Sequence, residues 1–214
     1  MKVCIILNGE VKDYNIIKKI IYKEKYDFII CADGGANHAY NMGITPDYII
    51  GDLDSASESV VNYYKEKNVS FEKFPSKKDE TDMEICIYLA EKLNAKRIDL
   101  IAAMGGRIDH TIANINLLYY IKEKNIFPRI ISENEEIQLA INEKLVLKGN
   151  KGDIISVIPT KGDANGVTLE NLEYPLEEYN MKYSMPLGIS NVMLGKLCSV
   201  SVKEGSLLVI RNIN

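Results

Sequence analysis

The acidic residues of this chain recur at positions where apolar runs end. Asp33 follows the run FIICA, Asp52 and Asp54 follow the run YIIG, and Asp109 closes the run LIAAMGGRI. An Asp that ends a strand of a βα unit lies at the carboxyl edge of a parallel sheet, where open α/β folds bind their ligands. We therefore expect these separate segments to meet at one crevice.

Residues 1–126 alternate between two kinds of pattern. Short apolar runs typical of strands are separated by stretches in which apolar residues recur every three or four positions, as in helices. Strands joined through helices form right-handed crossovers and a mostly parallel sheet. We therefore predict a Rossmann-like α/β domain with flanking helices, whose strands lie at residues 3–7, 28–32, 48–50, 70–74 and 98–102.

The pattern changes at Phe127. From there the apolar runs are short and closely spaced, and glycines separate them. This spacing is typical of antiparallel strands in a sandwich or a barrel. We predict a C-terminal antiparallel β-sandwich domain over residues 127–214, so that the fold is α/β followed by all-β.

The charge balance and the apolar runs exclude several classes of partner. The chain has 26 basic and 30 acidic residues and a pI near 5.4, so we expect no nucleic acid partner. The run 3–7 is too short for a signal peptide, and no run is long enough to span a membrane. Four scattered cysteines without a CxxC pair indicate reduced thiols, and we expect a cytoplasmic protein.

The segment GDLDS at 51–55 places two carboxylates two residues apart in a turn. Asp52 and Asp54 can both reach a hard divalent cation, and Mg²⁺ prefers a few carboxylates together with water and substrate phosphate oxygens. Helix capping is the alternative, because Ser55 and Glu58 have capping-box spacing and Asp54 favours a helix N-terminus. Both roles can hold at once, and we favour the metal role.

The segment KKDETD at 77–82 has a structural interpretation that capping statistics favour. Thr81 would cap a helix, Glu84 would close the capping box, and Lys77 and Lys78 would be solvated charges. Its position adds a functional interpretation, since the segment follows the strand predicted at 70–74 and so reaches the same edge of the sheet.

The segment GGRIDH at 105–110 also lies between a predicted strand and a predicted helix. Paired glycines let backbone amides approach a phosphate, a helix N-terminus favours anions, and Arg107 offers a bidentate fork. Asp33-Gly34-Gly35 repeats this pattern after an earlier strand, although tight turns need glycine anyway. The only two histidines, His38 and His110, do not assemble a zinc site easily, and each taken singly has a capping or packing role.

Three well-known motifs are missing from the sequence. There is no GxxxxGK[ST], no GxGxxG after the first strand and no GxSxG. P-loop enzymes, dinucleotide-binding Rossmann domains and hydrolases with a nucleophile elbow are therefore disfavoured.

Five short segments together resemble the ordered motif set of the thiamine pyrophosphokinase family: DGGAN (33–37), PDYIIGDLDS (46–55), KDETD (78–82), GGRIDH (105–110) and SMPLGISN (184–191). The match spans most of the chain and is less dense in the C-terminal half. The resemblance implies a nucleotide-binding catalytic domain at 1–126, a thiamine-binding and dimerisation domain at 127–214, and a homodimer. It implies Mg²⁺-dependent transfer of pyrophosphate from ATP to the hydroxyl of thiamine, with release of AMP.

The resemblance also implies roles for the motif residues. The expected metal ligands, directly or through water, are Asp52, Asp54, Asp79 and Asp82. The expected ATP-binding residues are Asp33, Gly34, Gly35, Asn37, Lys78, Asp79, Thr81, Arg107 and His110, among which Lys78 and Arg107 would stabilise phosphate charge. Asp109 would orient the thiamine hydroxyl or take its proton late in the reaction. The expected catalytic residues are Asp52, Asp54, Asp82 and Asp109. The expected thiamine contacts are Asp109, Met185, Ser190 and Asn191. Of these, Ser190 and Asn191 would come from the neighbouring subunit.

Two other functions remain open at this point. GDLDS after an apolar strand also resembles the DxD loop of haloacid-dehalogenase-type phosphatases, which form an aspartyl-phosphate, but the later lysine and acidic pair of that class are not evident here. A non-catalytic nucleotide-binding module is the other alternative, although such a site has little need for so many carboxylates beside phosphate.

Overall fold

The computed structural model describes residues 1–72 and 81–213. The chain divides into two compact units, Met1–Glu133 and Asn134–Asn214. The first unit is built on a parallel sheet and the second on antiparallel strands, which confirms the predicted fold class of α/β followed by all-β.

The sheet of the first unit has the spatial order β4-β3-β2-β1-β5-β6, and every neighbouring pair in it is parallel. Strands buried on both faces are apolar throughout, and β1 follows this rule because Val3 to Ile6 are fully buried. The strands are β1 (Lys2–Ile6), β2 (Phe28–Ala32), β3 (Tyr48–Ile50), β4 (Ser70–Glu72), β5 (Arg97–Ile101) and β6 (Phe127–Ile131).

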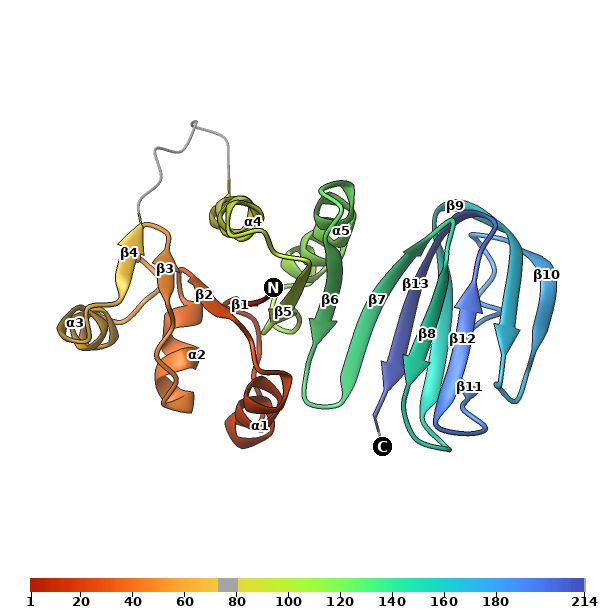
Figure 1. Ribbon diagram of the computed structural model, residues 1–214, viewed down its shortest axis with the longest axis horizontal. Helices are drawn as coiled ribbons and strands as arrows, with labels where there is room; N and C mark the ends of the chain where they lie inside the picture. The colour runs from red at the N-terminus through yellow and green to blue at the C-terminus, as the bar shows by residue number, and fades with distance from the viewer. Residues whose placement is uncertain (73–80, 214) are drawn as a thin grey trace. The chain divides into compact units, whose positions relative to one another are not determined.

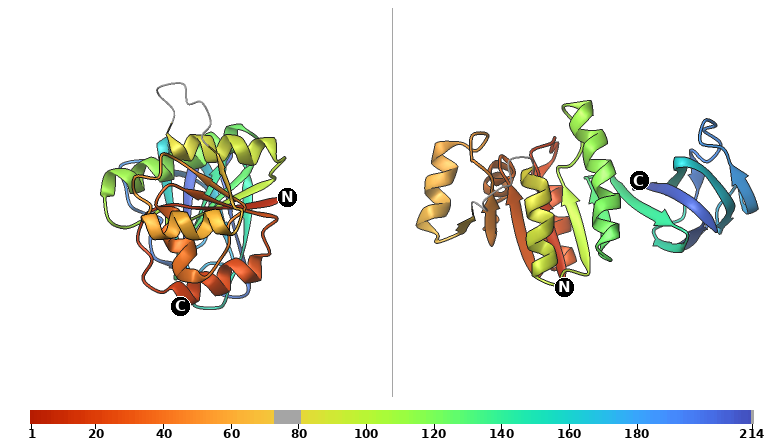
Figure 2. Two further views of the ribbon diagram at one scale, coloured as in Figure 1. Left: turned by 90° about the vertical axis from the view of Figure 1, so that its left-hand side faces the viewer. Right: turned by 90° about the horizontal axis from the view of Figure 1, so that it is seen from above.

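Helices cover both faces of this sheet. Helices α1 and α2 lie on one side and α4 and α5 on the other (Figure 1), and the right-hand view of Figure 2 looks at the sheet from the side of α4 and α5. The helices are α1 (Tyr14–Glu24), α2 (Gly35–Met42), α3 (Glu58–Glu66), α4 (Asp82–Lys92) and α5 (Ile108–Glu123). None of the helices in the described ranges is long and apolar enough to cross a membrane.

The direction of chain winding reverses at β1. Strands β2, β3 and β4 add to one side of β1, and the chain then crosses to β5 on the other side. Open α/β sheets bind ligands at such a reversal, outside the carboxyl ends of the strands. The loops that follow β1 and β5 are bonded together there, since the Gly9 amide donates to the Ala102 carbonyl at 2.8 Å and the Glu10 amide donates to the Met104 carbonyl at 2.8 Å.

The position of β6 bears on the predicted boundary between residues 126 and 127. The sequence pattern predicts this strand in the C-terminal domain, because short, closely spaced apolar runs begin there. In the structure β6 pairs in parallel with β5, with Ile98 opposite Pro128, and the two compact units divide after Glu133. The change from parallel to antiparallel pairing therefore comes one strand later than the change in sequence pattern.

The second unit contains seven antiparallel strands within the described residues, and the long strand β9 contributes to two sheets. The first half of β9 pairs with β13 and β11, and its second half pairs with β10 and β12. Left-handed backbone at Lys161 (φ 57°) and Gly162 (φ 127°) separates the halves. The strands are β7 (Glu135–Ile141), β8 (Lys144–Lys148), β9 (Ile154–Glu170), β10 (Leu176–Met181), β11 (Asn191–Val192), β12 (Leu197–Ser201) and β13 (Glu204–Asn212).

The four cysteines are buried and free of disulfides. Burial raises the pKa of the Cys198 thiol to about 11 and raises that of the other three further. All four thiols are therefore protonated at neutral pH and act as small core residues.

Candidate active site at the carboxyl edge of the parallel sheet

Three carboxylates meet beyond the ends of β2 and β3. Each of Asp33, Asp52 and Asp54 offers an oxygen, and these oxygens all lie within 4.8 Å of one another. The cluster forms because β2 and β3 are neighbours in the sheet and the Asp33 amide donates to the Ile50 carbonyl at 2.7 Å. Asp52 and Asp54 are exposed, whereas Asp33 Oδ1 is buried and has no hydrogen-bond partner among the described residues.

Asp82 joins this cluster from the first turn of α4. A Cβ placed on Gly51 would lie 3.2 Å from Asp82 Oδ2 and 3.1 Å from Asp33 Cβ, so the Gly51 backbone is packed between the two acidic side chains. Burial raises the pKa of Asp82, and the negative charges of Asp33, Asp52 and Asp54 raise it further. The raised pKa and the short distances indicate one patch of four carboxylates, and no positive charge among the described residues lowers the pKa of Asp82.

The backbone is strained at one residue of the GDLDS turn and at Asp33 beside it. Leu53 has a φ of 69° and Asp33 has a φ of 44°, both in the left-handed region that side chains other than Gly rarely adopt. Such residues cluster at functional sites, where surrounding interactions hold them. Within the turn, the Asp54 amide donates to Asp52 Oδ1 at 3.1 Å and Ser55 Oγ donates to Asp54 Oδ1 at 3.2 Å.

The capping alternative is wrong for GDLDS, and for KKDETD the predicted capping by Thr81 and Glu84 is confirmed. Helix α3 begins at Glu58 with Ser57 as its N-cap, so Ser55 lies before the helix and cannot cap it. Helix α4 begins with Thr81 as its N-cap and a complete capping box, in which the Thr81 amide donates to Glu84 Oε2 at 2.8 Å. Lys77, Lys78 and Asp79 were also predicted at this site, and they lie outside the described residues.

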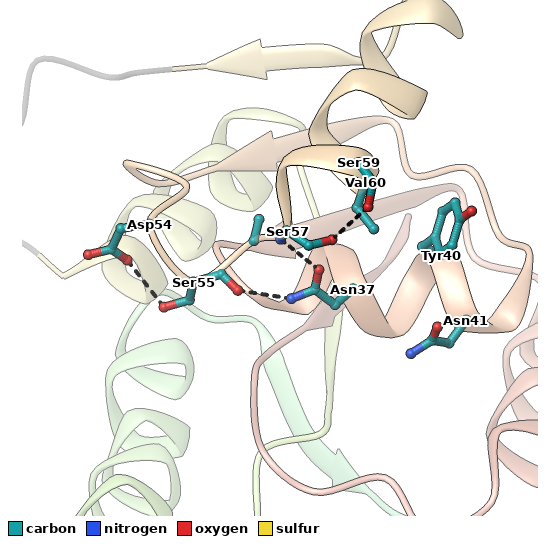
Figure 3. Close-up of a pocket in the computed structure, with 9 residues that line it drawn as sticks. Asn37, Tyr40, Asn41, Asp54, Ser55, Ser57, Ser59 and Val60 are labelled. Carbon is teal, nitrogen blue, oxygen red and sulfur yellow. Dashed lines mark hydrogen bonds between the residues drawn. The ribbon is translucent and has the colours of Figure 1, made fainter.

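Asn37 connects α2 to the segment that follows the carboxylates. Its Nδ2 donates to the Ser55 carbonyl at 2.9 Å, and its Oδ1 accepts from the Ser57 amide at 3.0 Å (Figure 3). One side chain therefore binds both ends of the tripeptide 55–57.

A pocket of about 480 Å³ opens beside Asp54 (Figure 3). Its lining is mostly polar and comes from α2, the 54–57 segment and the start of α3. The lining residues are Asn37, Tyr40, Asn41, Asp54, Ser55, Ala56, Ser57, Ser59 and Val60.

The GGRIDH segment lies farther along the sheet edge. It follows β5, and β2 and β1 separate β5 from β3, so the ends of β3 and β5 are about 14 Å apart at ordinary strand spacing. Arg107 forms a bidentate pair with Asp109, with Nε to Oδ1 at 3.1 Å and Nη2 to Oδ2 at 2.5 Å. This pairing lowers the pKa of Asp109. His110 is exposed, and its amide donates to Asp109 Oδ1 at 3.0 Å.

The loop after β1 also reaches this edge of the sheet, which was not predicted from the sequence. A Cβ on Gly34 would meet the Asn8 amide group at 2.4 Å, and a Cβ on Gly105 would meet Glu10 Cβ at 2.4 Å, so this loop lies against both glycine-rich turns. The signal was available, since an Asn-Gly pair follows the strand predicted at residues 3–7 and so reaches the same sheet edge.

His38 holds this loop from α2. Its Nε2 lies 2.9 Å from the Gly9 carbonyl, which can only accept, so Nε2 donates and Nδ1 accepts from the Tyr14 hydroxyl at 2.9 Å. Burial lowers the pKa of His38. The neutral imidazole therefore satisfies both partners, as the packing role predicted for this histidine requires.

The SMPLGISN segment of the second unit is exposed over most of its length. Met185, Leu187 and Ile189 are 60%, 55% and 51% exposed. The Gly188 carbonyl accepts from the Val157 amide at 2.8 Å, and the Ser190 amide donates to Ser156 Oγ at 3.1 Å. These bonds fix the segment on β9 and leave its apolar side chains in solvent.

Asn191 differs from its neighbours because it is only 4% exposed. Its Oδ1 accepts from the amides of Tyr174 and Val192, both at 2.9 Å, and its Nδ2 donates to the Tyr174 carbonyl at 2.7 Å. The side chain therefore anchors the backbone of Tyr174, and one amide hydrogen is left for any other partner.

Comparisons with known proteins agree with this two-part organisation. Residues 21–128 match the family model "Thiamin pyrophosphokinase, catalytic domain", and residues 136–207 match "Thiamin pyrophosphokinase, vitamin B1 binding domain". The thiamine pyrophosphokinase of Bacillus subtilis is 29% identical over 192 residues, which cover 89% of this chain and 90% of that protein. Thiamine pyrophosphokinase 1 of Oryza sativa is 27% identical over 190 residues, covering 77% and 71%.

The similarity extends to three dimensions. The crystal structure of the Bacillus subtilis thiamine pyrophosphokinase superposes with a TM-score of 0.88 at 27% identity and covers both chains fully. The order of elements in both units is therefore shared along the whole length of the two chains.

Proposed function

This chain belongs to the thiamine pyrophosphokinase family, and we propose that it transfers the terminal pyrophosphate of ATP to the hydroxyl of thiamine, giving thiamine pyrophosphate and AMP. The observation that carries this proposal is the carboxylate patch of Asp33, Asp52, Asp54 and Asp82 within the part of the chain that matches the catalytic model. A phosphatase of the haloacid-dehalogenase type and a non-catalytic nucleotide module are not favoured, since both family models belong to thiamine pyrophosphokinases.

The residues present fit a hard divalent cation. Three carboxylate oxygens lie within 4.8 Å of one another, and Asp33 Oδ1 is buried without a partner among the described residues, which is costly unless a cation or donor reaches it. We propose that Asp52, Asp54 and Asp82 hold Mg²⁺ directly or through water, with Asp79 as a further predicted ligand. When bound, Mg²⁺ would neutralise phosphate charge and align the phosphate oxygens.

The reaction requires alignment more than covalent catalysis. The hydroxyl oxygen of thiamine forms a bond to the β-phosphorus, the bond from that phosphorus to the bridging oxygen of the α-phosphate breaks, AMP leaves, and the hydroxyl proton is released. Arg107, with Lys78 as a further predicted residue, would stabilise the phosphate charge. The turns Asp33-Gly34-Gly35 and Gly105-Gly106 would bring backbone amides close to phosphate oxygens.

Asp109 suits the role of orienting the thiamine hydroxyl. Its pairing with Arg107 lowers its pKa and makes it a weak base. A weak base is sufficient where the proton leaves late, as in phosphoryl transfer through a loose transition state. Arg107 would hold Asp109 in one orientation until phosphate oxygens compete for the guanidinium.

The thiamine ring would contact the second unit. Met185 supplies an exposed apolar group, and Ser190, five residues later, supplies an exposed hydroxyl. All of the predicted phosphate-binding residues precede residue 111, whereas this segment follows residue 183. We propose a homodimer in which each site combines these parts from two copies of the chain, with cytoplasmic location as a further prediction.

One assay tests the proposed reaction. The protein is incubated with ATP, Mg²⁺ and thiamine, and the products are identified by mass. We expect AMP and thiamine pyrophosphate in equal amounts. ADP with thiamine monophosphate would indicate an ordinary kinase, and inorganic phosphate without a thiamine product would indicate a hydrolase, so either outcome refutes the proposal.

A further inference from the structure

The carboxamide of Asn37 has a distinctive position next to the carboxylate patch. It lies on α2, one turn after Asp33, and binds the backbone on both sides of Ala56. Ser55 directly follows Asp54, so the position of the Asp54 carboxylate depends on how this tripeptide is held.

Apart from Asn37, the segment from Gly51 to Ser57 is held by two side-chain hydrogen bonds within the turn and by partly buried Leu53 and Ala56, which pack against the core. It contains no helix or strand, and Leu53 within it adopts a left-handed conformation. One backbone bond crosses the turn, from the Ala56 amide to the Leu53 carbonyl at 3.3 Å, and it is longer than both bonds of Asn37. A strained turn that carries two exposed carboxylates needs a fixed partner to keep them together.

We propose that Asn37 is a positioning residue that holds Ser55 and Ser57 and thereby keeps Asp54 in the cation-binding arrangement. This inference rests on the proposed role of the carboxylate patch. Asn37 was expected from the family resemblance to bind ATP, but both ends of its carboxamide are engaged by backbone groups. The two bonds to the turn use the amide oxygen and one amide hydrogen, which leaves one amide hydrogen for a ligand.

Ser57 offers a way to break one of these bonds without changing Asn37. Ser57 has a φ of −67°, which proline also adopts, and proline has no amide hydrogen to donate to Asn37 Oδ1. Ser57→Ala is the matched control, because it keeps the amide and removes only the hydroxyl, which contacts Ser59 Oγ at 3.3 Å. Direct contact between Asn37 and ATP would survive in both variants.

The measurement is the affinity for Mn²⁺, determined by electron paramagnetic resonance in the absence of nucleotide and thiamine. We expect Asn37→Ala and Ser57→Pro to weaken Mn²⁺ binding by about 10-fold each, within the range typical of residues that orient metal ligands. Ser57→Ala should bind as wild type does. Asn41→Ala should also bind Mn²⁺ as the wild type does. It removes an asparagine side chain four residues later on α2, which contacts the Tyr14 hydroxyl and not the 55–57 segment. The double variant should bind no more weakly than Asn37→Ala, because the bond that Ser57→Pro removes is one of the two that Asn37→Ala already removes.

Two further measurements keep the outcomes separate. Melting curves identify a variant that fails to fold. If Ser57→Pro fails to fold, the affinity of Asn37→Ala for ATP is measured in EDTA. A positioning role predicts an unchanged affinity for ATP, whereas direct contact between Asn37 and ATP predicts a weaker one. Unchanged Mn²⁺ binding in folded Asn37→Ala overturns the inference alone. Wild-type protein that binds no Mn²⁺ overturns the metal assignment and this inference together, while the product assay reports on the reaction itself.

Discussion

Replacing Asp54 by Asn should stabilise the cation-free protein and abolish its activity. The substitution keeps the shape of the side chain, and Asn Oδ1 can still accept from Ser55 Oγ. It removes one of the mutually repelling negative charges in the patch of Asp33, Asp52, Asp54 and Asp82. A residue that served only the fold would not combine these two effects.

The size of the stability gain follows from the distances. At 4.8 Å, two unit charges repel by about 1 kcal/mol in water and by about 3 kcal/mol at an effective dielectric constant of 20. Asp52 and Asp54 are exposed, so the lower figure applies to each pair. Asp54→Asn should therefore raise the free energy of unfolding by about 1 to 2 kcal/mol, which raises the Tm by roughly 3 to 6 °C.

The assay is thermal melting with EDTA and with Mg²⁺, beside turnover measured as AMP. At ten times its Kd, Mg²⁺ should stabilise the wild type by about 1.4 kcal/mol and so raise its Tm. The Tm of Asp54→Asn should be almost unchanged by Mg²⁺. Glu58→Gln is the control, because it removes a nearby exposed charge in the first turn of α3, outside the patch, and should lower the Tm slightly. Near-normal kcat, or an equal Mg²⁺ response, in folded Asp54→Asn protein would refute this reasoning.

Three other predictions concern residues around the site. Burial lowers the pKa of His38 in the folded protein, so at a pH below the ordinary pKa of 6.5 the unfolded chain binds a proton there more readily than the folded chain does. The free energy of unfolding should therefore fall as the pH drops below about 6.5. Urea titrations at pH 7.5 and 5.5 should show a smaller fall for His38→Gln than for the wild type. Asn191→Ala removes the hydrogen bonds to the backbone of Tyr174 and should lower the free energy of unfolding by about 1 to 2 kcal/mol. Ser190→Ala should leave the Tm unchanged and raise the KM for thiamine. Equal Tm values for the two variants would contradict the anchoring role of Asn191. Mixing inactive Asp54→Asn subunits with inactive Met185→Asp subunits, under conditions of subunit exchange, should restore some activity, and verified mixed dimers that stay inactive would place the site within one chain.

The sequence predicted the carboxylate patch because its cause is local. Asp33, Asp52 and Asp54 each follow a short apolar run, and a run of that kind ends as a strand at the sheet edge. Strand order is a different matter, because it depends on pairings between distant segments. Nothing in the sequence pattern states that β1 and β2 lie between β5 and β3, so the distance along the sheet edge between the patch and the segment that carries Asp109 could not be predicted.

The two capping motifs show the same limit at shorter range. Ser55 and Thr81 both have Glu three residues later, but only Thr81 is an N-cap. The spacing reflects a local preference only. In the structure α3 begins at Glu58, and the 55–57 segment before it is bonded to Asn37 of α2. A helix start beside a functional turn is therefore less predictable than one that depends on capping alone.

Hydrogen-bond partners separate the motif residues into those that support the site and those that can bind a ligand. Asn37, Thr81 and Asn191 have their polar groups bound to backbone or to a capping partner. Asp33 Oδ1, in contrast, is buried without a partner among the described residues, beside carboxylates that can only accept hydrogen bonds. Such an arrangement is costly within the described part of the chain, since the acids repel one another and the buried oxygen loses its water. A bound cation would reverse both costs, which is the physical reason to expect that ligand at this edge of the sheet.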